Sequence, residues 1–140
     1  MAPDGEEIRR AMRMAIDRSG RALEEIEYIS YHGTATVLND PVESRSVRQV
    51  FGPLADRVQG SSVKSMIGHP QGASGAAGVV TAALGLSRGF LPPTINLIDP
   101  DQDCDLDFIP GTGRAVSAAA ALCNCLGFGS KNSALVLGAA

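Results

Sequence analysis

The chain has 140 residues, the size of one domain, and its 44% hydrophobic and 19% charged residues are typical of a globular protein and exclude a disordered one. Its 12 basic and 15 acidic residues give a net charge of −3, and no Lys/Arg cluster is interleaved with aromatic residues, so we expect no nucleic-acid partner. No apolar run is long enough to span a membrane, and residues 1–10 lack the apolar stretch of a secretory signal, so we expect no membrane partner and a cytoplasmic protein.

The N-terminal part of the chain predicts a helix followed by a strand. Ile8, Met12 and Ile16 recur at i, i+4 and i+8, which predicts an amphipathic helix over residues 4–18 that ends at Gly20. Residues 26–31 are rich in β-branched, aromatic and apolar side chains and predict a strand.

A second helix is predicted over residues 41–51. Asn39 and Asp40 offer an N-cap, and Pro41 suits the first helical position. Glu43 shares a face with Val47, so its carboxylate is expected to point the same way as the apolar stripe.

The middle of the chain predicts a strand over residues 58–63, a glycine-rich turn over 68–72 and a helix over 73–86. That helix carries only Ser74 and Thr81 as polar residues, so it has no solvent face and must be covered on all sides. One amphipathic helix and one half-exposed helix provide too little cover for it. We therefore expect the chain to be half of a larger unit and not a monomer.

The C-terminal part predicts an extended segment over residues 94–98 and strands over 106–109, 118–126 and 133–137. Strands that alternate with helices predict an α/β layer fold with a largely parallel sheet.

Two apparent metal motifs do not match known sites. The aspartates between residues 99 and 105 imitate a calcium loop, but Cys104 stands where that loop needs glycine and Pro110 where it needs glutamate. Cys123 and Cys125 have no second pair of ligands at zinc spacing. We expect no metal site, and three reduced thiols.

The two histidines of the chain are the strongest candidates for chemistry. His32 and His69 each follow an apolar strand and precede glycines that permit close approach of a ligand. With Lys64 and the inward-facing Glu43 they are expected to form a buried polar network. Two neutral imidazoles that donate to one oxygen would stabilise an enolate or oxyanion.

Five blocks of the sequence occur in an order and spacing typical of one family. The blocks are His32-Gly-Thr-Ala-Thr with Asn39-Asp40 and Glu43; Lys64-Ser-Met-Ile-Gly-His69-x-x-Gly-Ala-Ser-Gly-Ala-Ala-Gly; Leu91-Pro-Pro-Thr-Ile-Asn-Leu; Cys104-Asp-Leu-Asp-Phe; and Asn124-x-x-Gly-Phe-Gly. Together they resemble the β-ketoacyl-acyl carrier protein synthases, and the resemblance covers nearly the whole chain. Departures from the family pattern include Tyr31, Val37, Leu126 and Ser130-Lys131.

The resemblance implies a thiolase-like fold of five layers, α/β/α/β/α, of which residues 1–140 would form the C-terminal half as one domain. The nucleophilic cysteine of the family belongs to the N-terminal half, which is absent from this sequence. The implied reaction is a decarboxylative Claisen condensation of malonyl-acyl carrier protein with an acyl thioester, in fatty acid or polyketide synthesis.

Residue roles follow from the same resemblance. His32 and His69 would hold the malonyl thioester carbonyl and stabilise the enolate, with Lys64 as the third catalytic residue. Glu43 and Asp40 would be supporting residues, and Lys64 with Glu43 would form a buried ion pair that organises His69. The substrate-binding residues would be Thr34 and Thr36 on the phosphopantetheine arm and Phe128 at the acyl oxyanion hole.

The implied partners are an acyl carrier protein, which brings its own phosphopantetheine, and a chain with the N-terminal half, in a dimer or larger assembly. No other cofactor is expected. Two alternatives stay open: a non-catalytic pseudo-ketosynthase or chain-length-determining subunit, which binds carrier protein or shapes the acyl pocket, and a different thiolase-fold enzyme that uses the same histidines.

Overall fold

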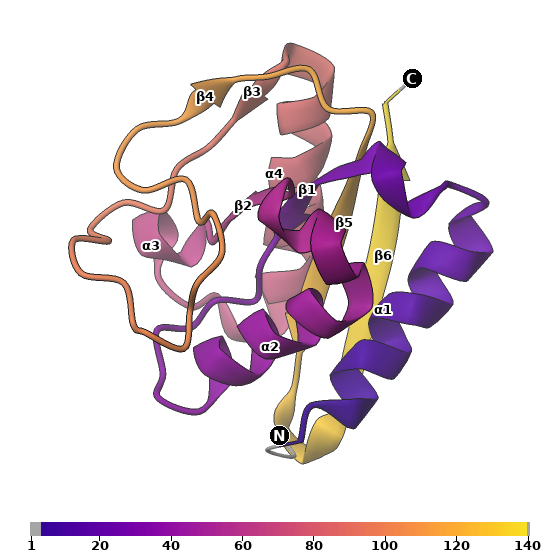
Figure 1. Cartoon of the computed structure of the whole chain (residues 1–140). Helices are drawn as coiled ribbons and strands as arrows, with labels where there is room; N and C mark the ends of the chain where they lie inside the picture. The colour runs from indigo at the N-terminus through magenta and orange to yellow at the C-terminus, as the bar shows by residue number, and fades with distance from the viewer. Residues whose placement is uncertain (1–3, 140) are drawn as a thin grey trace.

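The computed structural model describes residues 4–139. Residues 1–3 and 140 lie outside the described residues, so the first three residues of the segment expected to carry no secretory signal are not described. A four-stranded sheet lies between two layers of helix (Figure 1). The helices are α1 (Glu6–Ser19), α2 (Asn39–Phe51), α3 (Lys64–Ile67) and α4 (Ser74–Arg88). The strands are β1 (Ile26–Ser30), β2 (Gln59–Ser61), β3 (Phe90–Leu91), β4 (Arg114–Ala115), β5 (Ala120–Leu126) and β6 (Asn132–Gly138).

The sheet is mainly parallel, as the alternation of elements predicts. Its strand order is β2-β1-β5-β6, with β1 parallel to both β2 and β5 and with β6 antiparallel to β5. A mixed sheet of this kind, parallel with one antiparallel edge strand, is common in α/β folds. The carboxyl ends of β1 and β5 therefore lie at the same edge of the sheet.

Each face of the sheet has its own hydrophobic core. On one face α1 and α2 bury Ile8, Met12 and Val47 against Ile29 of β1. On the other face Ala82 and Leu86 of α4 pack with other buried side chains, among them Tyr28 of β1. Because successive strand residues point to opposite faces, β1 contributes to both cores.

The two predicted amphipathic helices are confirmed, with one correction at the start of α2. Helix α1 ends where Gly20 adopts the left-handed conformation, with φ of 68°. Helix α2 begins at Asn39, before the predicted Pro41; its N-cap residue Leu38 makes no side-chain cap, and the hydroxyl of Thr36 accepts a 3.2 Å hydrogen bond from the backbone N–H of Asn39. Asp40 is therefore not the N-cap, because its carboxylate accepts hydrogen bonds from the preceding loop at Thr34 and Ala35.

The prediction of extended structure over 94–98 and of a strand over 106–109 is wrong. Both segments form single β-bridges, Thr94 with Pro110 and Gln59 with Asp107. Asn96 has a positive φ of 64°, and proline cannot donate to a strand ladder, so neither segment continues as a strand. The predicted strand over 58–63 is shortened to β2, and the short helix α3 and the β3–β4 pair were not predicted.

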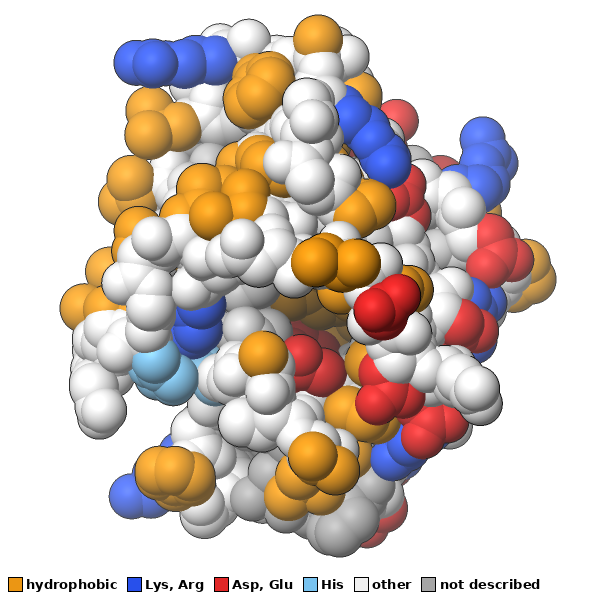
Figure 2. Space-filling view, turned by 90° about the vertical axis from the view of Figure 1, so that its left-hand side faces the viewer, with side chains coloured by type: hydrophobic (Ala, Val, Ile, Leu, Met, Phe, Trp, Pro, Cys, Tyr) orange, Lys and Arg blue, Asp and Glu red, His pale blue; other side chains and the backbone are white. Residues whose placement is uncertain are grey.

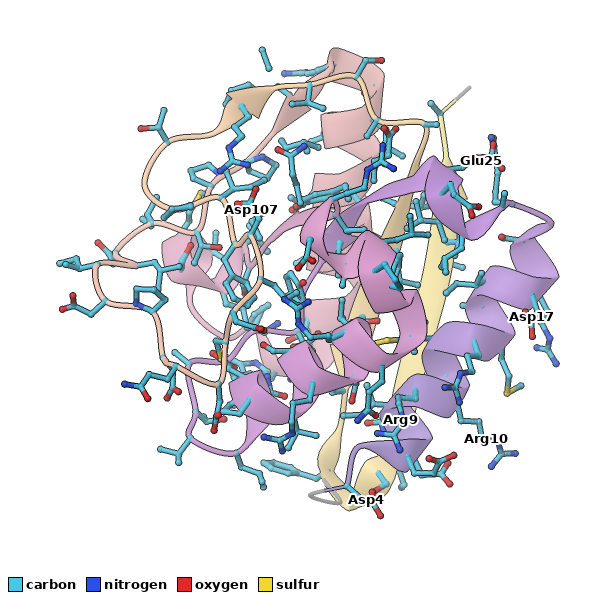
Figure 3. All side chains as sticks on the ribbon, in the orientation of Figure 1. Asp4, Arg9, Arg10, Asp17, Glu25 and Asp107 are labelled. Atoms are coloured by element: carbon cyan, nitrogen blue, oxygen red, sulfur yellow. The ribbon has the colours of Figure 1, made fainter. Side chains whose placement is uncertain are left out.

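Two arginines attach the long loop between β3 and β4 to the rest of the fold. Arg48 of α2 pairs with Asp105, and Arg114 pairs with Asp107, which Figure 3 labels on this loop. Partial burial raises the pKa of Asp107, but the guanidinium of Arg114 and the backbone N–H of Ile109 together outweigh burial, so the pKa is lowered.

Helix α4 is covered on one side only in this chain, which agrees with the expectation that the chain provides too little cover for it. Its residues Ala82 and Gly85 are buried against the sheet, whereas Val80 and Leu84 are 57% and 47% exposed. A single sheet covers one side of a helix only, so the opposite apolar side faces outward. Between residues 4 and 139 no helix is long and apolar enough to cross a membrane.

Candidate functional site

The structure brings the two histidines together, as the motifs predict. His32 lies two residues after the end of β1, and His69 lies in the turn between α3 and α4. Their ring centroids are 5.5 Å apart, and the planes meet edge to face at 81°. Figure 2 shows both imidazoles beside a basic side chain, next to a hollow that also carries acidic side chains. The side-chain alternation of an extended strand turns Tyr31 toward the α2 side and leaves His32 on the side of His69.

His32 is buried and neutral near pH 7. Burial, followed by the charges of Lys64 and His69, lowers its pKa to about 4. Its Nδ1 has no hydrogen-bond partner among the residues that the structure describes. A neutral imidazole carries one N–H, which suits it to donate to a substrate oxygen.

His69 is held differently from His32. Its ring is exposed in this chain, and its Nδ1 accepts a 3.0 Å hydrogen bond from the backbone N–H of Gln71. A backbone N–H can only donate, so Nδ1 is the unprotonated nitrogen and Nε2 carries the proton. The Nε2–H of His69 is thus free to act as a donor in the space beside His32.

Lys64 does not form the predicted ion pair with Glu43. Its Nζ donates a 2.6 Å hydrogen bond to the backbone carbonyl of His32, and Glu43 is bound by other donors. Burial lowers the pKa of Lys64, and the charge of Glu43 opposes this effect without direct contact. The first turn of α3 places Lys64 against the strand end, so the residue supports His32 and makes no hydrogen bond to His69.

Glu43 is the centre of the buried network. Its side chain is on α2 and is 1% exposed, and its carboxylate accepts from the backbone N–H groups of His32 at 2.9 Å and Gly33 at 3.0 Å. The side-chain amides of Asn39 and Asn124 also donate to it, at 3.3 Å and 3.0 Å. Burial raises the pKa of Glu43, and the hydrogen bonds from Gly33, His32 and Asn124 oppose this effect without reversing it.

Asn124 of β5 was not singled out as a site residue by sequence reasoning. It is the first residue of the Asn-x-x-Gly-Phe-Gly block, and its neighbours Cys123 and Cys125 indicated only that this segment is a buried strand. The parallel pairing of β5 with β1 places its amide at the same sheet edge as Glu43. The sequence feature that could have identified Asn124 as a site residue was therefore its place in this block, because an asparagine alone does not indicate a site.

The loop after His32 forms one wall of a cavity of about 480 Å³. The carboxylate of Asp40 accepts from the backbone N–H groups of Thr34 and Ala35, each at 3.1 Å, which holds the loop in a tight turn. The hydroxyls of Thr34 and Thr36 lie 3.1 Å apart on the cavity wall, which also includes Lys64. The predicted arm-binding threonines therefore share one cavity.

Phe128 lies apart from that cavity. It belongs to the turn between β5 and β6, where Gly129 has a φ of 67°, and its side chain is 98% exposed. The turn stands at the same sheet edge as His32, because β1 and β5 are parallel. Within this chain Phe128 does not take part in the site.

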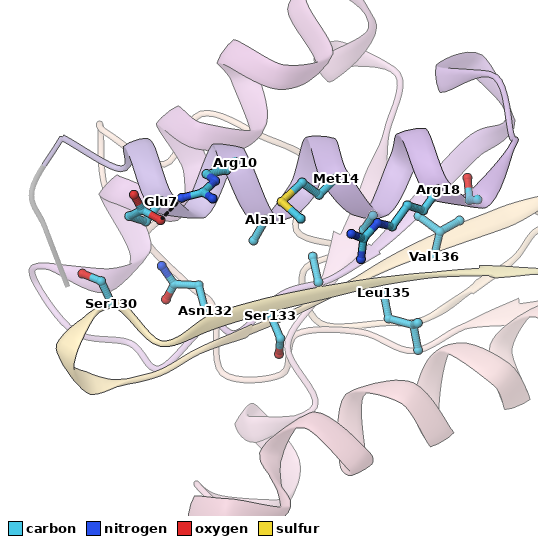
Figure 4. Close-up of a pocket in the computed structure, with 13 residues that line it drawn as sticks. Glu7, Arg10, Ala11, Met14, Arg18, Ser130, Asn132, Ser133, Leu135 and Val136 are labelled. Carbon is cyan, nitrogen blue, oxygen red and sulfur yellow. Dashed lines mark hydrogen bonds and ion pairs between the residues drawn. The ribbon is translucent and has the colours of Figure 1, made fainter.

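A second cavity, of about 520 Å³, lies between α1 and β6 (Figure 4). Its walls include Arg10, Met14 and Leu135, and it contains none of the predicted site residues, whereas Thr34, Thr36 and Lys64 line the first cavity. Only exposed or half-buried side chains line it, without the buried hydrogen-bond network that surrounds His32. The first cavity is therefore the one associated with the predicted site, through Lys64, Glu43 and the loop that follows His32.

The three cysteines are free thiols, as predicted. Burial raises the pKa of Cys123 to about 12, and burial followed by the charges of nearby aspartates raises the pKa of Cys104 against the effect of a hydrogen bond from Ser44. A raised thiol pKa disfavours the thiolate that a nucleophile requires.

The sequence of this chain was compared with protein families and with curated proteins, and the matches are to β-ketoacyl synthases. A family described as "Beta-ketoacyl synthase, C-terminal domain" matches residues 1–98. The 3-oxoacyl-[acyl-carrier-protein] synthase 2 of Synechocystis sp. is 43% identical over 95% of this chain and 32% of its own length, and that of Coxiella burnetii is 41% identical over 96% and 33%. The chain thus spans about a third of the length of the curated relatives it matches.

Solved structures give the same result. The ishigamide ketosynthase/chain length factor superposes with a TM-score of 0.94 at 38% identity, over 99% of this chain and 34% of that one. The complex of a type II polyketide synthase acyl carrier protein with its ketosynthase gives a TM-score of 0.96 at 35% identity, over 100% of this chain and 34% of the matched chain. The layered α/β architecture is that of the ketosynthases, and the chain belongs to the β-ketoacyl synthase family, of which it contains the C-terminal domain.

Proposed function

We propose that this chain supplies the His/His/Lys part of a β-ketoacyl-acyl carrier protein synthase site. The observation that carries the proposal is the edge-to-face contact of the His32 and His69 rings, with centroids 5.5 Å apart, beside a lysine that supports the first of them. The N-terminal half, with the nucleophilic cysteine, belongs to another chain or segment.

The chemistry of the pair suits a decarboxylative condensation. When a malonyl thioester loses its carboxylate as CO₂, the electron pair of the broken C–C bond becomes an enolate whose oxygen needs donors. His32 and the Nε2–H of His69 are neutral donors that face one space. The enolate carbon then attacks the acyl thioester on the cysteine of the other half, a C–C bond forms, and the cysteine thiolate leaves.

The substrate and partners follow from the cavity. The phosphopantetheine arm of an acyl carrier protein would pass along the cavity wall at Thr34 and Thr36, so the chain needs no cofactor of its own. The structural relative in complex with a carrier protein supports this partner. The exposed apolar side of α4 supports an assembly with the N-terminal half, in a cytoplasmic dimer or larger complex.

A second candidate is a non-catalytic subunit that determines chain length. Two structural relatives are described as a ketosynthase with a chain length factor. The buried support of His32 by Lys64 and Glu43 favours the catalytic role, because a subunit that only shapes a pocket does not need it.

The test measures decarboxylation and cysteine acylation separately. The chain is assembled with an N-terminal half that carries the nucleophilic cysteine, and CO₂ release from malonyl-acyl carrier protein is compared between wild type, His69→Ala and the control Gln49→Ala, a change at an exposed position of α2. We expect His69→Ala to lower decarboxylation by about 10²- to 10³-fold while cysteine acylation persists. Equal decarboxylation by wild type and His69→Ala would overturn the catalytic role and support the second candidate.

A further inference from the structure

Ser74 is a buried polar residue at the start of a largely apolar helix. It is the first residue of α4 and is 6% exposed. Its Oγ lies 3.2 Å from Nδ1 of His69, and this is its single side-chain hydrogen bond among residues 4–139. A buried hydroxyl needs a partner, and here the partner is an imidazole of the proposed site.

The direction of that hydrogen bond follows from a third residue. The backbone N–H of Gln71 already donates to the same Nδ1 at 3.0 Å, so Nδ1 carries no proton. The hydroxyl of Ser74 must therefore be the donor, because two acceptors would otherwise face each other. Gln71 itself has a positive φ of 52°, an uncommon conformation for a non-glycine residue, and this tight turn places its N–H toward the ring.

We propose that Ser74 is a positioning residue for His69: its hydroxyl adds a second donor to Nδ1, beside the N–H of Gln71, and so holds the ring in the orientation that directs the Nε2–H into the space shared with His32. The inference rests on the proposed function, since it concerns the same site. His32 has no equivalent, because its Nδ1 lacks a partner among the described residues and its own pKa is lowered by burial. The two imidazoles are thus held by different contacts.

The test reads the tautomer directly. The chain contains two histidines, so ¹⁵N labelling of the imidazoles gives two ring systems, which a His32→Gln variant assigns. The labelled chain is assembled with an unlabelled N-terminal half and compared as wild type, Ser74→Ala, Ser74→Thr and Ser87→Ala. Ser87 lies on the same helix, and its exposed hydroxyl bonds to Leu84, so Ser87→Ala is the matched control.

We expect wild type to show His69 with protonated Nε2 and bare Nδ1, and Ser74→Ala to populate the other tautomer or a rotated ring. A net hydrogen bond of about 1 kcal/mol corresponds to roughly a fivefold change in that ratio and a similar loss of decarboxylation. Ser74→Thr, which keeps the hydroxyl, should restore the wild-type spectrum, and Ser87→Ala should leave it unchanged.

Each other outcome has one meaning. An unchanged His69 spectrum in Ser74→Ala overturns the inference, even when the enzyme is active. A tautomer change in an assembly that never decarboxylates malonyl-acyl carrier protein supports the inference and overturns the proposed function. Where Ser74→Ala does not fold, Ser74→Cys replaces it as a weaker donor of similar size, and its spectrum must then lie between those of the other tautomer and wild type.

Discussion

Lys64 donates a hydrogen bond of 2.6 Å from its Nζ to the backbone carbonyl of His32. Glu43 accepts from the N–H of the same residue, at 2.9 Å. The two charged side chains therefore hold one residue from its carbonyl and its amide, although they do not pair with each other. The position of the His32 ring depends on both.

Replacing Lys64 should lower stability and decarboxylation more than replacing the exposed Lys131. In Lys64→Met the carbonyl of His32 loses its donor, so we expect unfolding free energy to fall by about 1–3 kcal/mol and decarboxylation to fall about tenfold. Lys131→Met, at the exposed second lysine of the chain, is the control. Urea unfolding and CO₂ release measure the two effects, and equal behaviour of the two variants would contradict the role of Lys64.

Glu43→Gln should be costly because the new amide is itself a donor and would face donors. Four N–H groups point at the carboxylate, so the substitution leaves at least one of them without an acceptor, at about 1–3 kcal/mol. Glu24→Gln, at an exposed carboxylate, should change unfolding free energy by less than about 0.5 kcal/mol.

The double variant Glu43→Gln/Lys64→Met tests whether the two residues act through His32. We expect a coupling energy of at least about 0.5 kcal/mol in a double-mutant cycle of unfolding free energy, because both residues bind the same residue. Additive losses would mean that the carbonyl and amide contacts are independent.

The folded protein should lose stability in acid through His32. Its pKa is lowered from 6.5 to about 4, so between these values the unfolded chain binds a proton that the folded protein does not. Unfolding free energy therefore falls as the pH falls from about 6.5 through about 4, by about 1–2 kcal/mol after allowance for solvent screening. The pKa of Glu43 is raised, so there is a pH range in which the folded protein binds a proton that the unfolded chain has released. The contribution of Glu43 to the unfolding free energy therefore falls as the pH rises, opposite to that of His32.

The measurement is denaturant unfolding of the assembled protein between pH 4 and 7. The difference between wild type and His32→Gln isolates the histidine from Glu43 and other groups. A difference that does not vary with pH would show that His32 has an ordinary pKa in the folded protein.

The exposed apolar side of α4 should be an assembly surface. Leu84→Glu places a charge on it and should weaken association with the N-terminal half, whereas Met14→Glu, at a similarly exposed apolar residue on α1, should not. Size-exclusion chromatography with light scattering measures the assembly. A stable 14.5 kDa monomer that binds no hydrophobic dye would contradict the expectation that the chain needs cover.

The ring of Tyr31 leaves no space for a side chain at position 60, so we expect glycine to be required there. A Cβ at position 60 would lie 2.2 Å from Cε2 of Tyr31 and 2.8 Å from the carbonyl oxygen of Ile29. We expect Gly60→Ala to lower unfolding free energy by about 1–3 kcal/mol. Gly72→Ala, where the new atom would meet nothing within 4 Å, is the control for thermal unfolding. Equal melting temperatures would mean that the ring moves freely.

Much of the fold and of the site composition was predictable from local patterns. The i, i+4 repeat of Ile8 and Met12 specified α1, and Gly20 ended it, because both signals act within one or two turns of chain. The order of the sequence blocks indicated that His32, His69, Lys64 and Glu43 belong to one site. Burial of Glu43 followed from its place on the apolar face of α2.

The hydrogen-bond partners within the site were decided by the tertiary structure alone. Periodicity reports which side chains turn inward, but a buried charge can be stabilised by a backbone group as well as by an opposite charge. The parallel pairing of β1 with β5 brought Asn124 to Glu43, and the unpredicted helix α3 turned Lys64 to the carbonyl of His32. These contacts join segments far apart in sequence, and no local pattern records which of the available donors and acceptors will meet.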